Sequence, residues 1–68
     1  MEFKSEEFIK REIEIAFYLL QDYKPDEIAI KLGISARHVM AHIKNMISKT
    51  NVKNMKALIQ LLKSFEKK

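Results

Sequence analysis

The chain has 68 residues, enough for one small domain whose limited core needs close helix packing or dimerisation for stability. It contains no cysteine, which excludes disulfides, thiolate metal ligands and a cysteine nucleophile. The formal charge is +4, but residues 1–27 hold four basic and eight acidic residues, whereas residues 28–65 hold seven basic residues and no acidic one. This polarity predicts a polyanionic partner that is approached by one face of the molecule.

Several other classes of function lack their sequence signatures. His38 and His42 lie four residues apart, but no third metal ligand is near them, so a surface pair is favoured over a metal site. The carboxylates, Glu12 and Glu14 among them, are interpreted as surface residues of helices, and no nucleophile lies beside a base, so no enzyme and no cofactor is predicted. No apolar run approaches the ~20 residues that span a bilayer, and the polar N-terminus is not a signal peptide, which predicts a cytoplasmic protein.

Apolar residues at helical spacing throughout, with one Gly and one Pro, predict an all-α fold. The first helix is expected at about residues 6–22. Its wheel favours an inward stripe of apolar residues, widened by Ile15 and Leu19, so burial on two sides is expected. The stripe consists of Ile9, Ile13, Ala16, Phe17 and Leu20.

A short helix, a glycine turn and a longer helix follow. The short helix is expected at about residues 25–32, because Pro25 suits a first helical position. Gly33 is the residue most able to adopt the left-handed conformation that ends it. Ser35 is a good N-cap for a third helix at about residues 36–50, which contains no acidic residue. This is the layout of a DNA-reading helix-turn-helix.

A helical wheel divides the third helix into an apolar and a polar face. The apolar face is expected to pack against the second helix and consists of Val39, Ile43, Met46, Ile47 and Thr50. The polar face is centred on Ala41, whose small side chain lets a helix approach the bases of the major groove. Lys44 is placed to donate to guanine acceptors and Asn45 to pair with adenine edges, whereas rim positions suit phosphate contacts. The candidate DNA-binding residues are Arg37, His38, Met40, Ala41, His42, Lys44, Asn45, Ser48 and Lys49, with Arg37, His38 and Lys49 at the rims.

The fourth helix is expected at about residues 54–65, with Asn54 as its N-cap. Its apolar arc is roughly twice the ~100° that a single core contact requires. Such surplus apolar surface is typical of a partner site, although a very small domain could bury both sides of the helix. A homodimer is predicted, with the candidate interface residues Ala57, Leu58, Leu61 and Phe65.

Taken together, these residues resemble the LuxR/GerE-type helix-turn-helix domain, which also forms the output domain of FixJ-like response regulators. The resemblance covers about residues 8–65. It rests on I-K-R-E at 9–12, D-E-I-A at 26–29, Leu32, I-S at 34–35, H-V-M-A-H at 38–42, Asn45, Lys49 and N-V-K-N-M at 51–55.

The resemblance implies four helices, with the third in the major groove and the fourth pairing two domains on a two-fold or direct-repeat site. It implies base contacts at Met40, Ala41 and Lys44, with His38 and His42 near the DNA backbone, and makes RNA polymerase a further candidate partner.

This sequence departs from the family pattern at several positions. Ile9 and Lys24 stand where the family has capping Ser or Thr residues, His38 replaces a common Thr, and Met55 replaces an Arg. Met40 replaces a Lys or Arg and removes a charge from the reading face, so the target sequence of relatives is not expected to transfer.

The predicted function is that of a sequence-specific regulator of transcription that binds double-stranded DNA as a homodimer. The main alternative is a small helical protein–protein interaction module whose basic face docks an acidic partner. Structured RNA is less favoured because the basic face lacks aromatic residues that stack on unpaired bases. A free-standing regulator and the output domain of a longer protein both remain compatible with the sequence.

Overall fold

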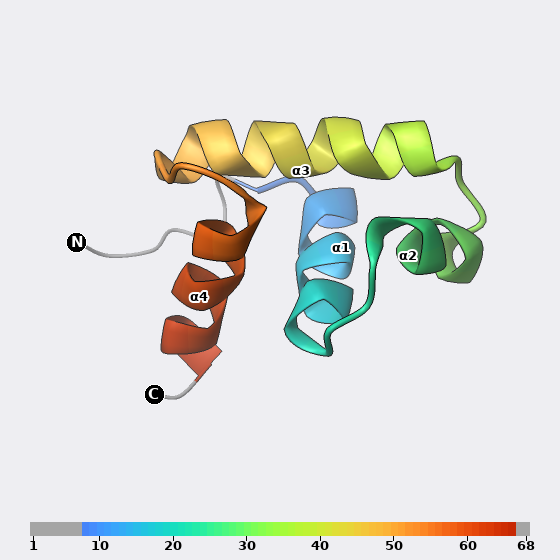
Figure 1. Ribbon diagram of the computed structural model, residues 1–68. Coiled ribbons are helices and arrows are strands. Elements are labelled where there is room, and N and C mark those ends of the chain that lie inside the picture. The colour runs from blue at the N-terminus through green and yellow to red at the C-terminus, as the bar shows by residue number, and fades with distance from the viewer. Residues whose placement is uncertain (1–7, 67–68) are drawn as a thin grey trace.

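The computed structural model describes residues 8–66 and consists, over this range, of four α-helices with short connections (Figure 1). The predicted all-α fold is therefore confirmed. The helices are α1 (Lys10–Leu20), α2 (Pro25–Leu32), α3 (Ala36–Thr50) and α4 (Met55–Glu66).

Helix α1 is shorter than expected at both ends. Ile9 has an extended backbone, so the helix begins at Lys10, and Asp22 has a left-handed φ of 68°, which prevents the helix from reaching that residue. The expected start at residues 6 and 7 lies outside the described residues.

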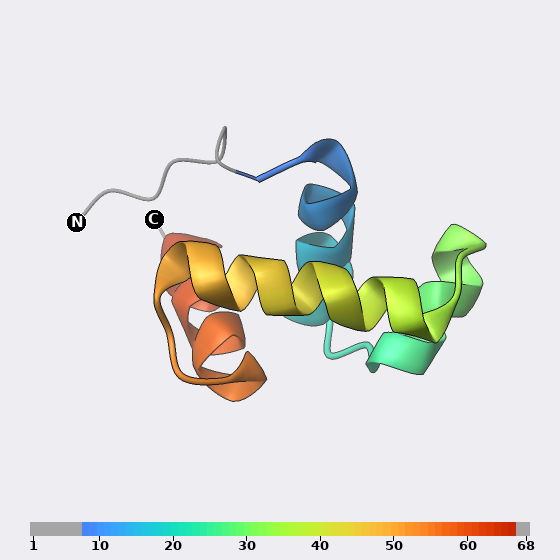
Figure 2. The ribbon, with the colours of Figure 1, turned by 90° about the horizontal axis from the view of Figure 1, so that it is seen from above.

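Helix α3 runs along one side of the molecule, and the other three helices lie on one side of it (Figures 1 and 2). Each of α1, α2 and α4 packs against α3, and α1 also packs against α4. One long surface of α3 is thereby left outside the body of the domain (Figure 1).

All four helices supply residues to a single core. The inward face predicted for α3 is confirmed, since Val39, Ile43 and Met46 are fully buried and Ile47 packs beside them. Thr50 is also buried, and its hydroxyl donates a hydrogen bond of 2.8 Å to the carbonyl oxygen of Met46. The other buried apolar residues are Phe8, Ile15, Ala16, Leu19, Ile28, Ala29, Leu58 and Leu62.

The inward stripe predicted for α1 is wrong at three of its five residues. Ile9, Ile13 and Phe17 are 52%, 47% and 62% exposed, whereas Ala16 is buried and Leu20 packs against the core as expected. The apolar arc of α1 is wider than its contact with the core, so periodicity alone does not decide which part of the arc faces inward. The helix is instead turned so that Ile15, Leu19 and the carboxylate of Glu12 lie inside.

Helices α1 and α2 start without a capping side chain at the N-cap. A glutamate three residues on compensates in part, because the Glu12 carboxylate accepts a hydrogen bond of 3.2 Å from the Ile9 N–H. Glu27 accepts an equivalent bond of 2.8 Å from the Lys24 N–H. One half of a capping box therefore remains where Ile9 and Lys24 depart from the family pattern.

The caps predicted for the other two helices are confirmed. Ser35 Oγ accepts a hydrogen bond of 3.1 Å from the His38 N–H at the start of α3. Asn54 Oδ1 accepts one of 2.9 Å from the Ala57 N–H at the start of α4. These polar contacts satisfy backbone donors that a helix start leaves unpaired.

Candidate nucleic-acid interface

The turn between α2 and α3 sets the angle at which α3 leaves the core. Gly33 has φ 69°, ψ 33°, the left-handed conformation expected from its type, and ends α2. The Ile34 N–H then donates back to the Ala29 carbonyl oxygen at 3.0 Å, which closes the turn. Ser35, two residues after the glycine, is the N-cap of α3, so the connection between the two helices is very short.

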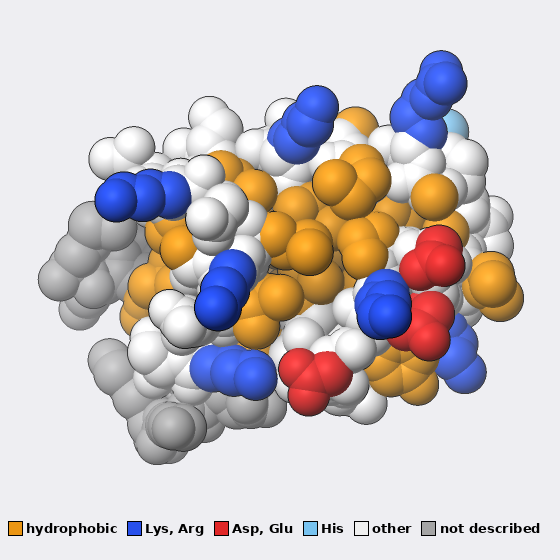
Figure 3. Space-filling view, in the orientation of Figure 1, with side chains coloured by type: hydrophobic (Ala, Val, Ile, Leu, Met, Phe, Trp, Pro, Cys, Tyr) orange, Lys and Arg blue, Asp and Glu red, His pale blue; other side chains and the backbone are white. Residues whose placement is uncertain are grey.

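The outer surface of α3 brings most of the predicted DNA-binding residues together. Ala41 lies near the middle of this surface, with Lys44 one turn after it and Arg37 one turn before it. In Figure 3, Lys and Arg side chains project along the edge that α3 forms, while the acidic side chains visible in this view lie away from it. The exposed residues of this set other than Lys49 are Arg37, His38, Met40, Ala41, Lys44, Asn45 and Ser48, and we call these seven the open face of α3.

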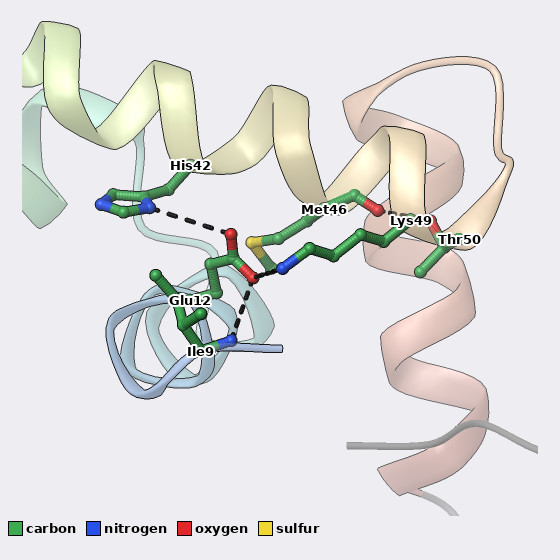
Figure 4. A network of polar contacts seen from close by, with 6 residues as sticks. All are labelled: Ile9, Glu12, His42, Met46, Lys49 and Thr50. Atoms are coloured by element: carbon green, nitrogen blue, oxygen red, sulfur yellow. Dashed lines mark hydrogen bonds and ion pairs between the residues drawn. The ribbon is translucent and has the colours of Figure 1, made fainter. Parts of the chain in front are cut away.

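The remaining two predicted DNA-binding residues lie on the flank of α3 that faces α1 (Figure 4). Lys49 Nζ lies 2.7 Å from Glu12 Oε1, and the Lys49 side chain is 32% exposed. His42 Nδ1 lies 3.9 Å from Glu12 Oε2. The same His42 nitrogen is buried and, within the described residues, has no hydrogen-bond partner. Neither side chain is part of the open face.

Glu12 is the polar residue that sequence reasoning missed, because it was interpreted as a surface carboxylate. Its side chain is only 1% exposed, and Oε1 accepts hydrogen bonds from both the Ile9 N–H and Lys49 Nζ. Its place three residues after an N-cap was a signal for the first of these bonds. The partner from α3 could not be found in the same way, because it lies 37 residues further along the chain.

Helix α4 contributes both to the core and to the surface. Leu58, predicted for the dimer interface, is fully buried in the core of its own chain and exposes no surface to a partner. Its neighbours Ala57, Leu61 and Phe65 are half-buried and follow one another at a spacing of four residues, which places them on one side of the helix. On the polar side, Lys63 Nζ lies 3.6 Å from Asp22 Oδ1.

Residues 8–66 contain neither a metal-binding group of side chains nor a membrane-spanning helix. No group of His, Asp or Glu side chains in this range could hold a metal ion. No helix in the same range is long and apolar enough to cross a membrane.

A short helix, a left-handed glycine turn and an outward-facing basic helix together define a helix-turn-helix domain. Residues 7–62 match the luxR family of bacterial regulatory proteins, also called GerE. Because the match covers most of the chain, the chain belongs to this family, and it is a DNA-binding domain of a transcription regulator. Curated proteins and solved structures gave no match.

Proposed function

We propose that this domain reads a specific sequence of double-stranded DNA by inserting α3 into the major groove, and that it does so as a homodimer. The observation that carries the proposal is the open face of α3, which is exposed and lacks any acidic residue. A single helix fits the major groove, and the other three helices lie on one side of α3, leaving this face accessible (Figure 1).

The central residues of the open face are proposed to read the bases. Ala41 has no side chain beyond its methyl group, so the helix axis can approach the base edges, and the methyl can touch a thymine methyl. Lys44 is exposed, so its ammonium can donate to guanine acceptors, and Asn45 can pair with adenine edges. Met40 and Ser48 complete the proposed contact set with an apolar and a hydroxyl group.

The N-terminal end of α3 and the flank that faces α1 are proposed to contact the DNA backbone. Arg37 lies in the first turn of α3, where its guanidinium can bind phosphate. His38 lies beside it, with its ring nitrogen Nδ1 3.1 Å from Ser35 Oγ, so its ring is held close to the helix start. The His42 side chain is proposed to lie near the backbone at the side that faces α1.

The proposed dimer pairs α4 with α4 of a second copy. Support comes from the half-buried apolar residues Ala57, Leu61 and Phe65 on one side of the helix, whereas Leu58 serves the core. Two domains related in this way would read two half-sites, as helix-turn-helix dimers do. We further propose that the protein acts in the cytoplasm, with RNA polymerase as a partner in regulation.

The decisive experiment is a titration of duplex DNA at several salt concentrations. Each phosphate that the domain neutralises steepens the dependence of log affinity on log salt by about 0.9, so several contacts predict a slope of several units. Duplex RNA and an acidic polypeptide serve as controls of similar charge. Absence of duplex DNA binding at low salt, together with binding to the acidic polypeptide, would establish the protein-partner alternative instead.

A further inference from the structure

The buried carboxylate of Glu12 binds α3 at Lys49 and faces it at His42. One oxygen binds Lys49 Nζ at 2.7 Å, and the other lies 3.9 Å from His42 Nδ1 (Figure 4). His42 and Lys49 are separated by about two helical turns, so they lie on the same side of α3. A single carboxylate therefore faces a long section of the flank of α3.

The burial of Glu12 makes this connection difficult to release. Its side chain is 1% exposed, so its charge has almost no contact with water and depends on partners within the protein. Those partners are the Lys49 ammonium and the Ile9 N–H. Removal of the ammonium to a DNA phosphate would leave a buried carboxylate without a cation, which is strongly unfavourable.

The position of the Lys49 ammonium is also fixed from a second side. Lys49 Nζ lies 5.8 Å from the centroid of the Phe8 ring, within the range of a cation–π contact. The ammonium is therefore bounded by a carboxylate and an aromatic ring, both from the segment that begins α1. The positive charge that the sequence places at this rim of α3 is neutralised inside the domain.

We propose that Glu12 is a positioning residue that fixes the flank of α3 against α1 and withholds Lys49 from the DNA. The inference rests on the proposed function, and it replaces the expectation that Lys49 anchors a phosphate. Of the two basic residues expected at the rims of α3, Arg37 near the N-terminal end then contacts phosphate, whereas Lys49 near the C-terminal end does not.

Matched substitutions of two cations on α3 test this assignment. Arg37→Met is expected to make the salt slope of duplex DNA binding shallower by about 0.9, the effect of one lost phosphate contact. Lys49→Met is expected to leave the slope unchanged, with affinity altered less than about twofold once the folded fraction is corrected by circular dichroism. A decrease of about 0.9 for Lys49→Met would overturn the inference.

Glu12→Gln provides the reciprocal test. The amide keeps the shape of the side chain and an oxygen for the Ile9 N–H, but it releases the charge of Lys49. The slope is expected to steepen by about 0.9, so that affinity falls about threefold more than in the parent protein between 50 and 200 mM salt. The double variant with Lys49→Met is expected to restore the parent slope. An unchanged slope in folded Glu12→Gln would contradict the inference.

Amine labelling of the unmodified domain gives a test that does not depend on the stability of a variant. Lys49 is expected to react slowly, and DNA is expected to change its labelling rate by less than about twofold, because its ammonium is already bound. Lys44 is the comparison, since it is exposed and is expected to be protected by DNA. Strong protection of Lys49 by DNA would overturn the inference. Complete lack of DNA binding would overturn the proposed function instead, which separates the two failures.

Discussion

Lys44 lies close to the centre of the open face of α3. It lies nearly one turn after Ala41, so its side chain leaves the helix beside the smallest residue on the surface. No carboxylate in α3 competes for its ammonium, because the helix contains no acidic residue. A donor in this position, in a groove where guanine presents two acceptors, can distinguish one base pair from the others.

Replacement of Lys44 by alanine is therefore expected to weaken binding to a selected DNA site by about 1–3 kcal/mol, and binding to random DNA by less. Lys56→Ala, on the polar side of α4, is the matched control and is expected to change both affinities little. Fluorescence anisotropy with a selected duplex and a scrambled one measures the two losses. Equal relative losses on both duplexes would identify Lys44 as a phosphate contact.

For single residues, the sequence predicted which side chains of α3 are exposed better than it predicted which side chains contact one another. The exposed residues of the open face follow from the wheel of α3, because its apolar face is narrow and unambiguous. The pairing of Glu12 with Lys49 could not be predicted, since it depends on how α1 is rotated and on where α3 crosses it. A charged residue at a rim position is equally compatible with a phosphate contact and with an internal ion pair.

The turn between α2 and α3 depends on the conformation of one residue. Gly33 has a positive φ, and a Cβ atom added to it would meet nothing within 4 Å. A substitution there would therefore strain the backbone without any clash. Asn51 adopts almost the same conformation, with φ 60°, at the end of α3, where asparagine tolerates it.

Gly33→Ala is expected to lower the free energy of unfolding by about 1–2 kcal/mol, because an L-residue with a side chain disfavours the left-handed conformation. Asn51→Gly tests the same conformation from the opposite direction and is expected to leave stability within about 0.5 kcal/mol of the parent, or above it. Urea unfolding followed by circular dichroism measures both. A Gly33→Ala protein as stable as the parent would show that the turn tolerates another conformation.

Local sequence signals were sufficient to predict the bounds of helices that begin or end at a proline, a glycine or a capping residue. Pro25, Gly33 and Ser35 fix the bounds of α2 and the start of α3, and these agree with the structure. The orientation of α1 was not predictable in this way, because apolar residues occupy more than half of its circumference. The choice between two halves of such an arc is made by tertiary packing, here by the contacts of Ile15 and Leu19 with the core.

The distribution of charge gives the whole molecule a leading face. Five acidic residues lie on α1, on α2 and in the connection between them, whereas residues 28–65 carry seven basic residues and no acidic one. This separation steers the open face of α3 toward a polyanion. A dimer through α4 would double the charge that approaches a DNA site and would make the affinity depend on protein concentration.

Sedimentation velocity over a range of concentrations is expected to show reversible dimerisation of the domain, strengthened by a duplex with two half-sites. Leu61→Ala is expected to weaken the dimer by about tenfold, or about 1.4 kcal/mol, as for a buried interface residue. Gln60→Ala, the adjacent residue on the polar side, is the control without effect. Leu58→Ala is expected to lower the stability of the fold itself, by about 2–5 kcal/mol. A monomer at high concentration, with and without DNA, would contradict the dimer.

The outward turn of Ile9, Ile13 and Phe17 on α1 has a practical consequence for handling the protein. These three side chains form an apolar stripe outside the core, and about half of the surface of each is in contact with water. Apolar patches of this kind promote association at high concentration. Polar substitutions at these positions are therefore expected to raise the solubility of the purified domain.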